Sequence, residues 1–549
     1  MNLINSAKVI EWVFDQGVID FCLCAGARNS PLISIMDENK SLLEKVGGNL
    51  YHFFEERSAS FFALGRSQIS KRPVAIITTS GTATTELISA TVEAFYTQTP
   101  LILITADRPP NYRGTGAPQS IEQIGIFSHY AYPTIDLYQN FDLLETLNWD
   151  KLKPLHLNVC FSEPLLNGDI PILNFNNFCI EVPTELENQL QTKKSIISSI
   201  NSCFPSTHLF FSNSKRPLFI ISGLSHDERE FVLSKLKKIK GAFWIESLSG
   251  LRGHPEFEAR RIKSGERFLQ FLIEKEIFDS IIRIGSIPTT RLWRDLEMKY
   301  LIPVLSLSNG IWSGLARESL TLPLIYLQDV LDKYQSSDLS LSEDFYSKDI
   351  FVSKLIHHKV EQFPCSQWNF IRQLSQIIQT NPLYLGNSLP IREWDFIANP
   401  FNSIAINGNR GANGIDGQLS TFFGWKPKNV NHSWAILGDL TTLYDLSAPW
   451  IISQLKNQNW TLVIMNNSGG QIFKPMFERE AFINRHNINF ENWAKMWGLT
   501  YSCLNSFQID RFYSLFKPQI PQILELRPSE EQSNLLRQEI ESIWKTNLL

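Results

Sequence analysis

The sequence predicts an α/β protein with three doubly wound domains built on mainly parallel sheets. Short apolar, β-rich runs alternate with amphipathic helical stretches, which is the pattern of strands covered by helices on both faces. Polar stretches at residues 185–214 and 335–347 interrupt this alternation twice. The length of 549 residues suggests about three domains at roughly 100–200 residues each. We expect their limits at residues 1–185, 186–350 and 351–549.

Each domain contributes its own strands and helices to this pattern. In the first, we expect strands at residues 18–23, 72–78 and 100–105 and helices at 58–67 and 85–96. In the second, we expect strands at 217–222, 242–245 and 281–284 and a helix at 227–238. In the third, we expect strands at 383–385, 403–406, 433–437 and 461–465 and a helix at 445–459. Ligands of such sheets bind where strands end, which in the first domain means the loops at residues 25–31, 79–83 and 106–110.

Composition and charge exclude several classes of protein. Hydrophobic residues make up 43% of the chain and 28 glycines add to them, which matches the ordinary globular range of roughly 45–50%. The formal net charge is −4, so nothing favours a nucleic-acid partner. No apolar run approaches the ~18–20 residues that cross a bilayer, so we expect no membrane insertion. The first eight residues do not predict a signal peptide.

The cysteines and the absence of nucleotide-binding motifs exclude further classes of protein. Seven scattered cysteines do not predict a disulfide framework, and we expect a cytoplasmic protein. Cys22 and Cys24 suit either a metal site or core packing, and packing is favoured because no partner pair lies nearby. No Gly-X-Gly-X-X-Gly follows a strand, and no P-loop sequence is present, which argues against a nicotinamide-dependent oxidoreductase or a P-loop enzyme.

The most informative stretch lies in the third domain. Gly438-Asp439-Leu440 follows one expected strand, and Asn466-Asn467-Ser468-Gly469-Gly470 follows the next. A right-handed crossover makes the two strands parallel, so Asp439 and Asn467 should emerge at the same edge of the sheet. Their oxygens, with a backbone carbonyl of the glycine pair, suit Mg²⁺ or Mn²⁺ together with a phosphate. The alternative is that Asp439 caps the segment that follows it and that residues 466–470 form a turn.

Five motifs in chain order carry a resemblance to a known family. They are Phe54-Glu55-Glu56-Arg57-Ser58-Ala59, Thr79-Ser80-Gly81-Thr82-Ala83, Thr105-Ala106-Asp107-Arg108-Pro109, Asn409-Arg410-Gly411-Ala412-Asn413-Gly414-Ile415-Asp416-Gly417 and Asn467-Ser468-Gly469-Gly470-Gln471-Ile472-Phe473. With the Gly-Asp that precedes Asn-Asn across residues 441–465, the chain closely resembles the 2-succinyl-5-enolpyruvyl-6-hydroxy-3-cyclohexene-1-carboxylate synthases, a thiamine-diphosphate-dependent family. The resemblance covers nearly the whole chain and is weakest in the middle. It implies the thiamine-diphosphate-binding fold, with a pyrimidine-binding domain first, a central domain, and a diphosphate- and metal-binding domain last.

The resemblance also implies a reaction and an assembly. Thiamine diphosphate with Mg²⁺ or Mn²⁺ would decarboxylate 2-oxoglutarate, and the succinyl carbanion equivalent would add 1,4 to isochorismate in menaquinone biosynthesis. In this superfamily the pyrimidine-binding domain of one subunit faces the diphosphate-binding domain of its partner. A homodimer is therefore the smallest active unit expected, and a homotetramer stays open.

Glu56 receives the catalytic role by resemblance. A glutamate at this position hydrogen-bonds N1′ of the cofactor's pyrimidine and favours its imino tautomer, which requires a carboxyl group with a raised pKa in a dry site. Glu55 is the weaker candidate because the match places the acid directly before Arg57. From the residues alone, a solvated start of a helix is favoured, and the other motifs reverse this choice.

The remaining site residues follow from the same motifs. The resemblance implies cofactor contacts from Glu56, Ser80, Gly81, Ile415, Gly438, Asp439, Leu440, Asn467, Gly469, Ile472 and Phe473, with the metal held by Asp439, Asn467 and Gly469. By spacing alone, core packing is favoured for Ile415, Ile472 and Phe473. Both substrates carry two carboxylates, and arginine can grip a carboxylate through two parallel hydrogen bonds. Substrate contacts are implied for Arg28, Arg108, Gln119, Arg291, Ser388, Arg392 and Arg410.

Several positions depart from the expected patterns. Leu440 replaces the third glycine of the superfamily signature, as it does in this family, and Arg291 stands where the family tends to have lysine. Ala27 replaces a serine, and Pro118 and Glu86 each replace an asparagine. The changes at 27 and 118 remove possible hydrogen bonds to isochorismate, worth about 0.5–1.5 kcal/mol each.

Two other functions stay open at this point. A carboligase of the acetolactate-synthase type would keep Glu56, Asp439 and Asn467 but would not need Arg28, Arg392 and Arg410 together. Changes at Glu56, Asp439 or Asn467 would favour a catalytically silent regulatory relative, but all three residues are intact.

Overall fold

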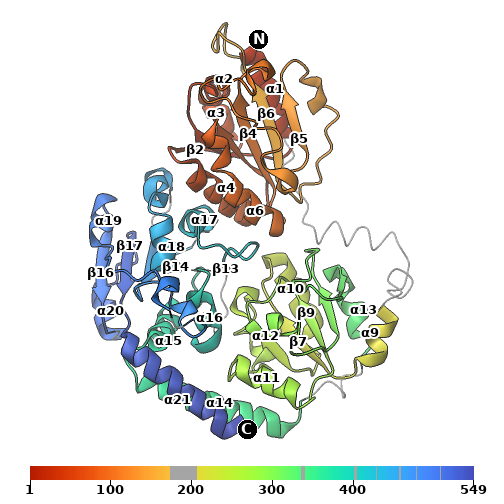
Figure 1. Cartoon of the computed structure of the whole chain (residues 1–549), viewed down its shortest axis with the longest axis vertical. Coiled ribbons are helices and arrows are strands. Elements are labelled where there is room, and N and C mark those ends of the chain that lie inside the picture. The colour runs from red at the N-terminus through yellow and green to blue at the C-terminus, as the bar shows by residue number, and fades with distance from the viewer. Residues whose placement is uncertain are drawn as a thin grey trace. The chain divides into compact units, whose positions relative to one another are not determined.

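The computed structural model describes residues 1–173, 207–334, 341–400, 405–427, 430–456, 459–477, 479–506 and 509–548. The described strands form three sheets of six, five and six strands, and every pairing between them is parallel (Figure 1). The predicted α/β class with three mainly parallel sheets is therefore confirmed. No helix in these ranges combines the length and the apolar character needed to span a membrane.

The chain divides into two compact units. The first contains the described parts of residues 1–182, 409–428 and 441–458, and the second contains those of 183–408, 429–440 and 459–549. The expected domain limit at 185/186 lies outside the described residues. The limit at 350/351 falls inside helix α14 (Glu343–Glu361), so the three-domain division stays a prediction.

The first sheet has the order β2-β1-β3-β4-β6-β5. Its strands are β1 (Asp20–Cys24), β2 (Asn49–Phe53), β3 (Val74–Thr78), β4 (Leu101–Asp107), β5 (Thr134–Leu137) and β6 (Leu155–Cys160). Its helices are α1 (Asn2–Asp15), α2 (Ser30–Glu38), α3 (Lys40–Lys45), α4 (Glu56–Ser70), α5 (Thr82–Thr85) and α6 (Ile88–Tyr96). All residues of β1, β3, β4 and β6 are buried. Burial on both faces explains the continuous apolar runs at residues 74–77 of β3 and 101–104 of β4. Cys22 and Cys24 are buried in β1, as expected for core packing.

The second sheet has the order β11-β10-β9-β7-β8. Its strands are β7 (Pro217–Ile221), β8 (Phe243–Ile245), β9 (Ser280–Ile284), β10 (Val304–Leu307) and β11 (Leu320–Leu322). The accompanying helices are α9 (Thr207–Asn213), α10 (His226–Leu236), α11 (Glu266–Glu274), α12 (Arg291–Asp295) and α13 (Leu327–Leu331). Ser225 begins α10 with a capping box: its hydroxyl accepts from the Glu228 N–H, and the Glu228 carboxylate accepts from the Ser225 N–H.

The third sheet has the order β13-β12-β14-β15-β17-β16, which repeats the strand order of the first. Its strands are β12 (Leu383–Leu385), β13 (Ile406–Asn407), β14 (Ser433–Gly438), β15 (Trp460–Met465), β16 (Thr500–Leu504) and β17 (Gln522–Leu526). Besides α14, the helices of this part of the chain are α15 (Gln367–Ile378), α16 (Leu389–Ile397), α17 (Gln418–Trp425), α18 (Asp439–Tyr444), α19 (Glu491–Met496), α20 (Ile509–Leu515) and α21 (Glu530–Leu548).

Three expected elements differ from the structure. The helix expected at 85–96 is split into α5 and α6. The helix expected at 445–459 is wrong: α18 already starts at Asp439, and a 3₁₀ helix, η7 (Ala448–Gln454), follows it. Pro449 lies in the first turn of η7, where its missing N–H is tolerated but where it cannot continue a preceding helix. The strand expected at 403–406 is only β13, and residues 401–404 lie outside the described part.

Helices α4 and α17 of the first unit approach each other at two glycines. A Cβ on Gly65 would meet the backbone oxygen of Thr421, and a Cβ on Gly424 would meet that of Phe62. Both would lie far inside van der Waals contact, so only glycine fits at either position. This close packing holds α4, whose first residue is Glu56, against α17, the helix that follows the 409–417 loop.

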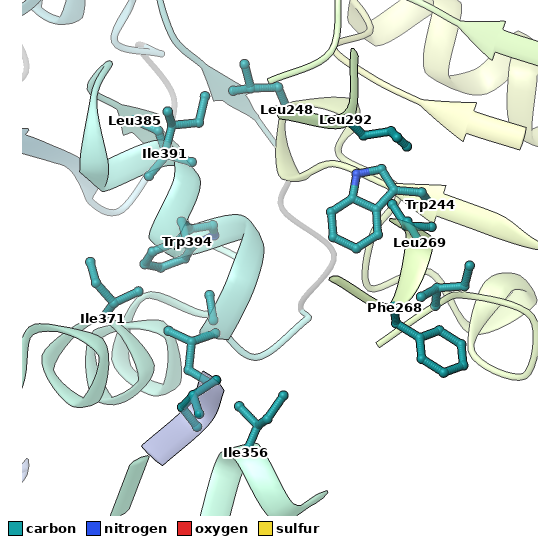
Figure 2. Close-up of a cluster of buried hydrophobic side chains, with 14 of the residues drawn as sticks. Trp244, Leu248, Phe268, Leu269, Leu292, Ile356, Ile371, Leu385, Ile391 and Trp394 are labelled. Carbon is teal, nitrogen blue, oxygen red and sulfur yellow. The ribbon is translucent and has the colours of Figure 1, made fainter. Parts of the chain in front are cut away.

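One hydrophobic core joins the second and third sheets within the second unit. Trp244, Leu248 and Phe268 come from the second sheet and its helices, and Leu385 and Trp394 come from the third (Figure 2). Leu248 stands at the carboxyl end of β8, and a Cβ on Gly408 would touch it at 3.9 Å. The segment that follows β8 therefore packs against the segment that follows β13.

Candidate active site

Asp439 and the Asn467–Gly469 loop lie at one edge of the third sheet. Strands β14 and β15 are parallel neighbours, with Gly438 opposite Met465, so the chain leaves both strands at the same edge. The Gly469 N–H donates to Asp439 Oδ2 at 2.9 Å, and the Leu440 N–H donates to Oδ1 at 2.6 Å. The first of these bonds links the start of α18 to the Asn467–Gly469 loop across 30 residues of sequence.

Gly469 occupies a position that only glycine fills without strain. Its φ is +126°, and a Cβ there would meet the backbone oxygens of Ile483 and Asn484. The glycine therefore lets this loop pack directly against the backbone of residues 483–484.

The two asparagines of this loop have different surroundings. Asn466 is buried, and its Nδ2 donates to Glu525 Oε1 at 2.8 Å and to the Ile488 carbonyl at 2.9 Å. Asn467 uses its Nδ2 differently, donating to Gln367 Oε1 at 2.9 Å. Because the nitrogen of the Asn467 amide is bound by Gln367, Oδ1 is the atom available to a cation.

The electrostatics of Asp439 suit a cation. Its side chain is 2% exposed, and burial raises its pKa, while the N–H of Gly469, the N–H of Leu440 and the nearby His486 lower it. His486 Nε2 lies 3.3 Å from Oδ2. A divalent cation at this carboxylate would compensate the cost of burying its charge.

The donor set fits a magnesium- or manganese-type site that is completed by its ligand. A carboxylate, an amide oxygen and a backbone carbonyl are hard oxygen donors, and such a cation also takes phosphate and water. Within the described ranges, no group of three or more His, Cys, Asp and Glu side chains is placed to hold a metal ion. The protein side chains at this edge would thus supply only part of the coordination sphere.

Glu56 is the first residue of α4, in the first unit, and its neighbour Glu55 is the N-cap. Glu55 Oε2 accepts from the Ser58 N–H at 3.2 Å and from Ser447 Oγ at 2.7 Å, and Oε1 lies 3.3 Å from Arg57 Nε. Glu55 is thus committed to holding the helix start. Burial raises the pKa of Glu56, its own N–H lowers it, and the charges of Glu55 and Glu86 raise it.

Arg28, Ser80, Gly81 and Arg108 follow β1, β3 and β4 of the first sheet. Gly81 has φ +83°, and a Cβ there would touch Gln119 at 3.4 Å, so the structure brings Gln119 to the 79–83 loop. Arg28 Nη1 donates to the Phe161 carbonyl at 3.2 Å and lies 3.1 Å from Glu163 Oε1. Arg108 donates to the Pro118 carbonyl at 3.1 Å and stacks over Tyr112.

The loop with Arg410 and Ile415 is held by a buried acid in the same unit. Glu93 of α6 is 2% exposed and accepts from the N–H groups of Gly411 and Ala412 at 2.7 and 2.6 Å. Burial raises the pKa of Glu93, and the two N–H groups and Arg410 lower it. A cavity of about 270 Å³ lies between α6 and this loop, but none of the predicted site residues lines it.

The other predicted residues belong to the second unit. Ser388 precedes α16 with φ +72°, and Arg392 Nη1 donates to its carbonyl at 2.7 Å. Burial lowers the pKa of Arg392, and Glu266, Glu246 and Asp395 raise it. Arg291 is exposed and lies 3.6 Å from Asp295 of its own helix. Ile472 and Phe473 form a 3₁₀ turn after the glycine pair, and Phe473 is partly exposed.

Comparison with known proteins assigns the chain to a family. A curated protein of Bdellovibrio bacteriovorus named 2-succinyl-5-enolpyruvyl-6-hydroxy-3-cyclohexene-1-carboxylate synthase is 41% identical over 99% of both chains. The chain belongs to this synthase family. Proteins of the same name from Akkermansia muciniphila (32% identical, 95% of both chains) and Shewanella amazonensis (28% identical, 99% of this chain and 98% of the other) are also similar. Residues 6–126 match the family model for the N-terminal, thiamine-pyrophosphate-binding domain of thiamine pyrophosphate enzymes.

The predicted family is therefore confirmed, and this synthase-family member is a thiamine-diphosphate-dependent enzyme. The match to the binding-domain model spans the segment that contains Arg28, Glu56, Ser80, Gly81 and Arg108. The individual residue roles stay predictions.

Sequence reasoning missed several polar residues that hold the loops of this synthase-family member. Gln123 is fully buried, accepts from the Gly81 N–H at 2.9 Å and donates to the Ala106 carbonyl at 3.1 Å. Glu93 and Gln367 play comparable parts at the 409–417 loop and at Asn467. A lone acid in the apolar stretch of α6 was a signal for Glu93. No local pattern marks the two glutamines.

Proposed function

We propose that this protein decarboxylates 2-oxoglutarate and adds the succinyl carbanion equivalent 1,4 to isochorismate. The product would be 2-succinyl-5-enolpyruvyl-6-hydroxy-3-cyclohexene-1-carboxylate, an intermediate of menaquinone biosynthesis. Similarity to the Bdellovibrio synthase over 99% of both chains is the observation that carries this proposal. The intact Glu56, Asp439 and Asn467 support it over a catalytically silent relative.

Asp439, Asn467 and the Gly469 carbonyl would hold Mg²⁺ or Mn²⁺ and, through it, the diphosphate of the cofactor. When bound, thiamine diphosphate would supply the electron sink, its thiazolium ring, that accepts the electron pair released when CO2 leaves the 2-oxoacid. Gly438, Leu440, Ser80 and Gly81 would line the cofactor with backbone groups or small side chains. The contact between the Gly469 N–H and Asp439 supports this arrangement.

Glu56 would hold a proton at N1′ of the pyrimidine. Its raised pKa supports this role, because a carboxyl group shares a proton with a weak base best when their affinities for the proton are close. Ile415, Ile472 and Phe473 would exclude water around the reacting carbon, which strengthens the electrostatic interactions there.

Cationic side chains would bind the carboxylates of both substrates. Arg28 and Arg108 end strands of the first sheet, and Arg410 lies on the loop held by Glu93. Arg392 follows Ser388 in the second unit, and Arg291 stands where the family tends to have lysine. Gln119, which lies against Gly81, would add a hydrogen bond.

The assembly and location complete the proposal. We expect a homodimer or homotetramer, because the resemblance implies a site shared between two copies. The cytoplasm is the proposed location, supported by a sparse set of cysteines that are free wherever the structure describes them.

A substrate comparison tests the proposed reaction. The protein is incubated with thiamine diphosphate, Mg²⁺ and isochorismate, together with either 2-oxoglutarate or pyruvate, and the product is identified by mass. We expect the succinyl adduct from 2-oxoglutarate and little turnover of pyruvate. Preference for pyruvate would indicate an acetolactate-type carboligase, and no product from either acid would indicate a silent relative.

A further inference from the structure

Asn467 begins a hydrogen-bonded series of three polar side chains that come from three separate segments. Asn467 Nδ2 donates to Gln367 Oε1 at 2.9 Å, and Gln367 Nε2 donates to Glu393 Oε2 at 2.6 Å. Gln367 is the first residue of α15, and Glu393 belongs to α16. Their exposed fractions are 3% and 4%, so water does not compete strongly for these groups.

The direction of these hydrogen bonds decides which end of the Asn467 amide faces away from Gln367. A primary amide has an oxygen that accepts and a nitrogen that donates, and only the oxygen binds a cation. Rotation by a half turn about χ2 would exchange the two ends of Asn467. The Gln367 amide has the same ambiguity, so it cannot select an orientation by itself.

Glu393 removes the ambiguity. An ionised carboxylate only accepts hydrogen bonds, so it must bind the nitrogen of Gln367. The Gln367 oxygen then points to Asn467 and binds its nitrogen, which leaves the Asn467 oxygen for other ligands. Burial raises the pKa of Glu393 to about 7, while Arg537, 3.9 Å from Oε1, favours the ionised form.

We propose that Gln367 and Glu393 are positioning residues that hold the oxygen of Asn467 toward a divalent cation. The inference rests on the metal-binding role proposed for Asn467. The Asn467 backbone is held separately, because Gln471 Nε2 donates to its carbonyl at 3.1 Å. Gln367 and Glu393 thus act on the side chain, whereas Gln471 acts on the main chain.

A double-mutant comparison of metal affinity tests this role. Mn²⁺ binding in the presence of thiamine diphosphate is measured at pH 8 by electron paramagnetic resonance of free Mn²⁺. We expect Gln367→Met to weaken binding by on the order of tenfold, the lower end of the effect of residues that orient metal ligands. In an Asn467→Asp background both ends of the side chain are oxygens, so orientation no longer matters, and Gln367→Met should cause no further loss.

A matched control separates this effect from a general loss of packing. Ser533→Ala removes the hydroxyl that accepts from the Gln367 backbone N–H at 3.1 Å. It leaves the hydrogen bonds between the side chains of residues 467, 367 and 393 intact. It should leave Mn²⁺ affinity unchanged. Should Gln367→Met fail to fold, Glu393→Gln replaces it, because the nearly isosteric amide can donate as well as accept and should give the same pattern.

The possible outcomes separate this inference from the proposed metal site. Equal losses in the two backgrounds, or no loss when residue 467 is asparagine, would overturn the positioning role. If the unaltered protein shows no Mn²⁺ binding, or if Asn467→Ala binds Mn²⁺ normally, the metal assignment itself fails and the inference fails with it. Binding that is lost in Asn467→Ala but unchanged in Gln367→Met would overturn the inference alone.

Discussion

Two adjacent glutamates at the start of α4 show how single residues divide their roles. Glu55 is bound by a serine hydroxyl, a backbone N–H and an arginine, whereas Glu56 keeps a raised pKa in the same turn. An acid committed to capping is a poor proton carrier, because its charged form is stabilised by the cap. Geometry therefore supports the choice of Glu56 that the resemblance suggested.

Replacing Glu56 by glutamine should reduce turnover by about 10²–10⁴-fold, the usual scale of acid–base assistance, because the amide cannot exchange a proton with N1′. Cofactor affinity should change little. Steady-state kinetics and calorimetric titration with thiamine diphosphate check both expectations. The comparison variant is Glu55→Gln, which should mainly lower stability by weakening the cap. Normal turnover in Glu56→Gln would exclude Glu56 as the activating acid.

Glu86 supplies a second prediction at this scale, because its charge helps to raise the pKa of Glu56. Removing that charge in Glu86→Gln should lower the pKa of Glu56. The limb of the pH–rate profile that disappears in Glu56→Gln should therefore move to lower pH. Glu86→Asp keeps the charge and should leave the limb near its original position. A limb that stays in place in Glu86→Gln would show that the two carboxylates do not interact.

At the scale of elements, the packing of α4 on α17 connects two parts of the candidate site. Glu56 begins α4, and the loop with Arg410 and Ile415 leads into α17. Glycines at the crossing let the two backbones touch, which makes the position of one helix depend on the other.

Gly424→Ala should lower the free energy of unfolding by about 1–3 kcal/mol, because the added Cβ would overlap the Phe62 backbone oxygen and force the helices apart. Urea denaturation followed by circular dichroism measures this change. Ser70→Ala at the end of α4 is the control and should stay within about 0.5 kcal/mol of the unaltered protein. Stability equal to that of the control would mean that the crossing tolerates a larger separation.

At the scale of the whole molecule, the sequence predicts the sheets better than the long-range hydrogen bonds that hold the loops. Strands such as β3 and β15 are buried throughout, so they appear as uninterrupted apolar runs. Edge strands such as β13 and β5 are short or only half-buried and leave a weaker pattern.

The strand-end positions of Asp439 and Asn467 were also predictable from local motifs, whereas the residues that hydrogen-bond to such loops from distant parts of the sequence were not. Asp439 and Asn467 follow strands, and strand–helix–strand geometry brings them to one edge. Gln367 binds Asn467 across 100 residues, and Glu93 binds Gly411 across 318 residues. Hydrogen bonds over such separations leave no periodic signal in the sequence. The start of α18 at Asp439 was not predicted, since the sequence pattern placed the helix at residues 445–459.

Mixing two inactive variants tests whether the site is shared between copies. Glu56 belongs to the first compact unit and Asp439 to the second, so Glu56→Gln and Asp439→Ala damage different units. If each site combines two copies, one site of every mixed dimer is intact. Co-expression should then restore about a quarter of the full activity, since about half of randomly formed dimers are mixed. Activity no higher than that of the separate variants would indicate a site within one chain.

Retention of the cofactor by Asp439→Ala tests the central claim most directly. Protein is loaded with thiamine diphosphate and Mg²⁺, passed through gel filtration, and its bound cofactor is quantified. We predict that the unaltered protein keeps the cofactor and releases it after chelation of the metal, whereas Asp439→Ala keeps none under either condition. Metal-dependent retention by Asp439→Ala equal to that of the unaltered protein would contradict the assignment of the cation to the edge formed by β14 and β15.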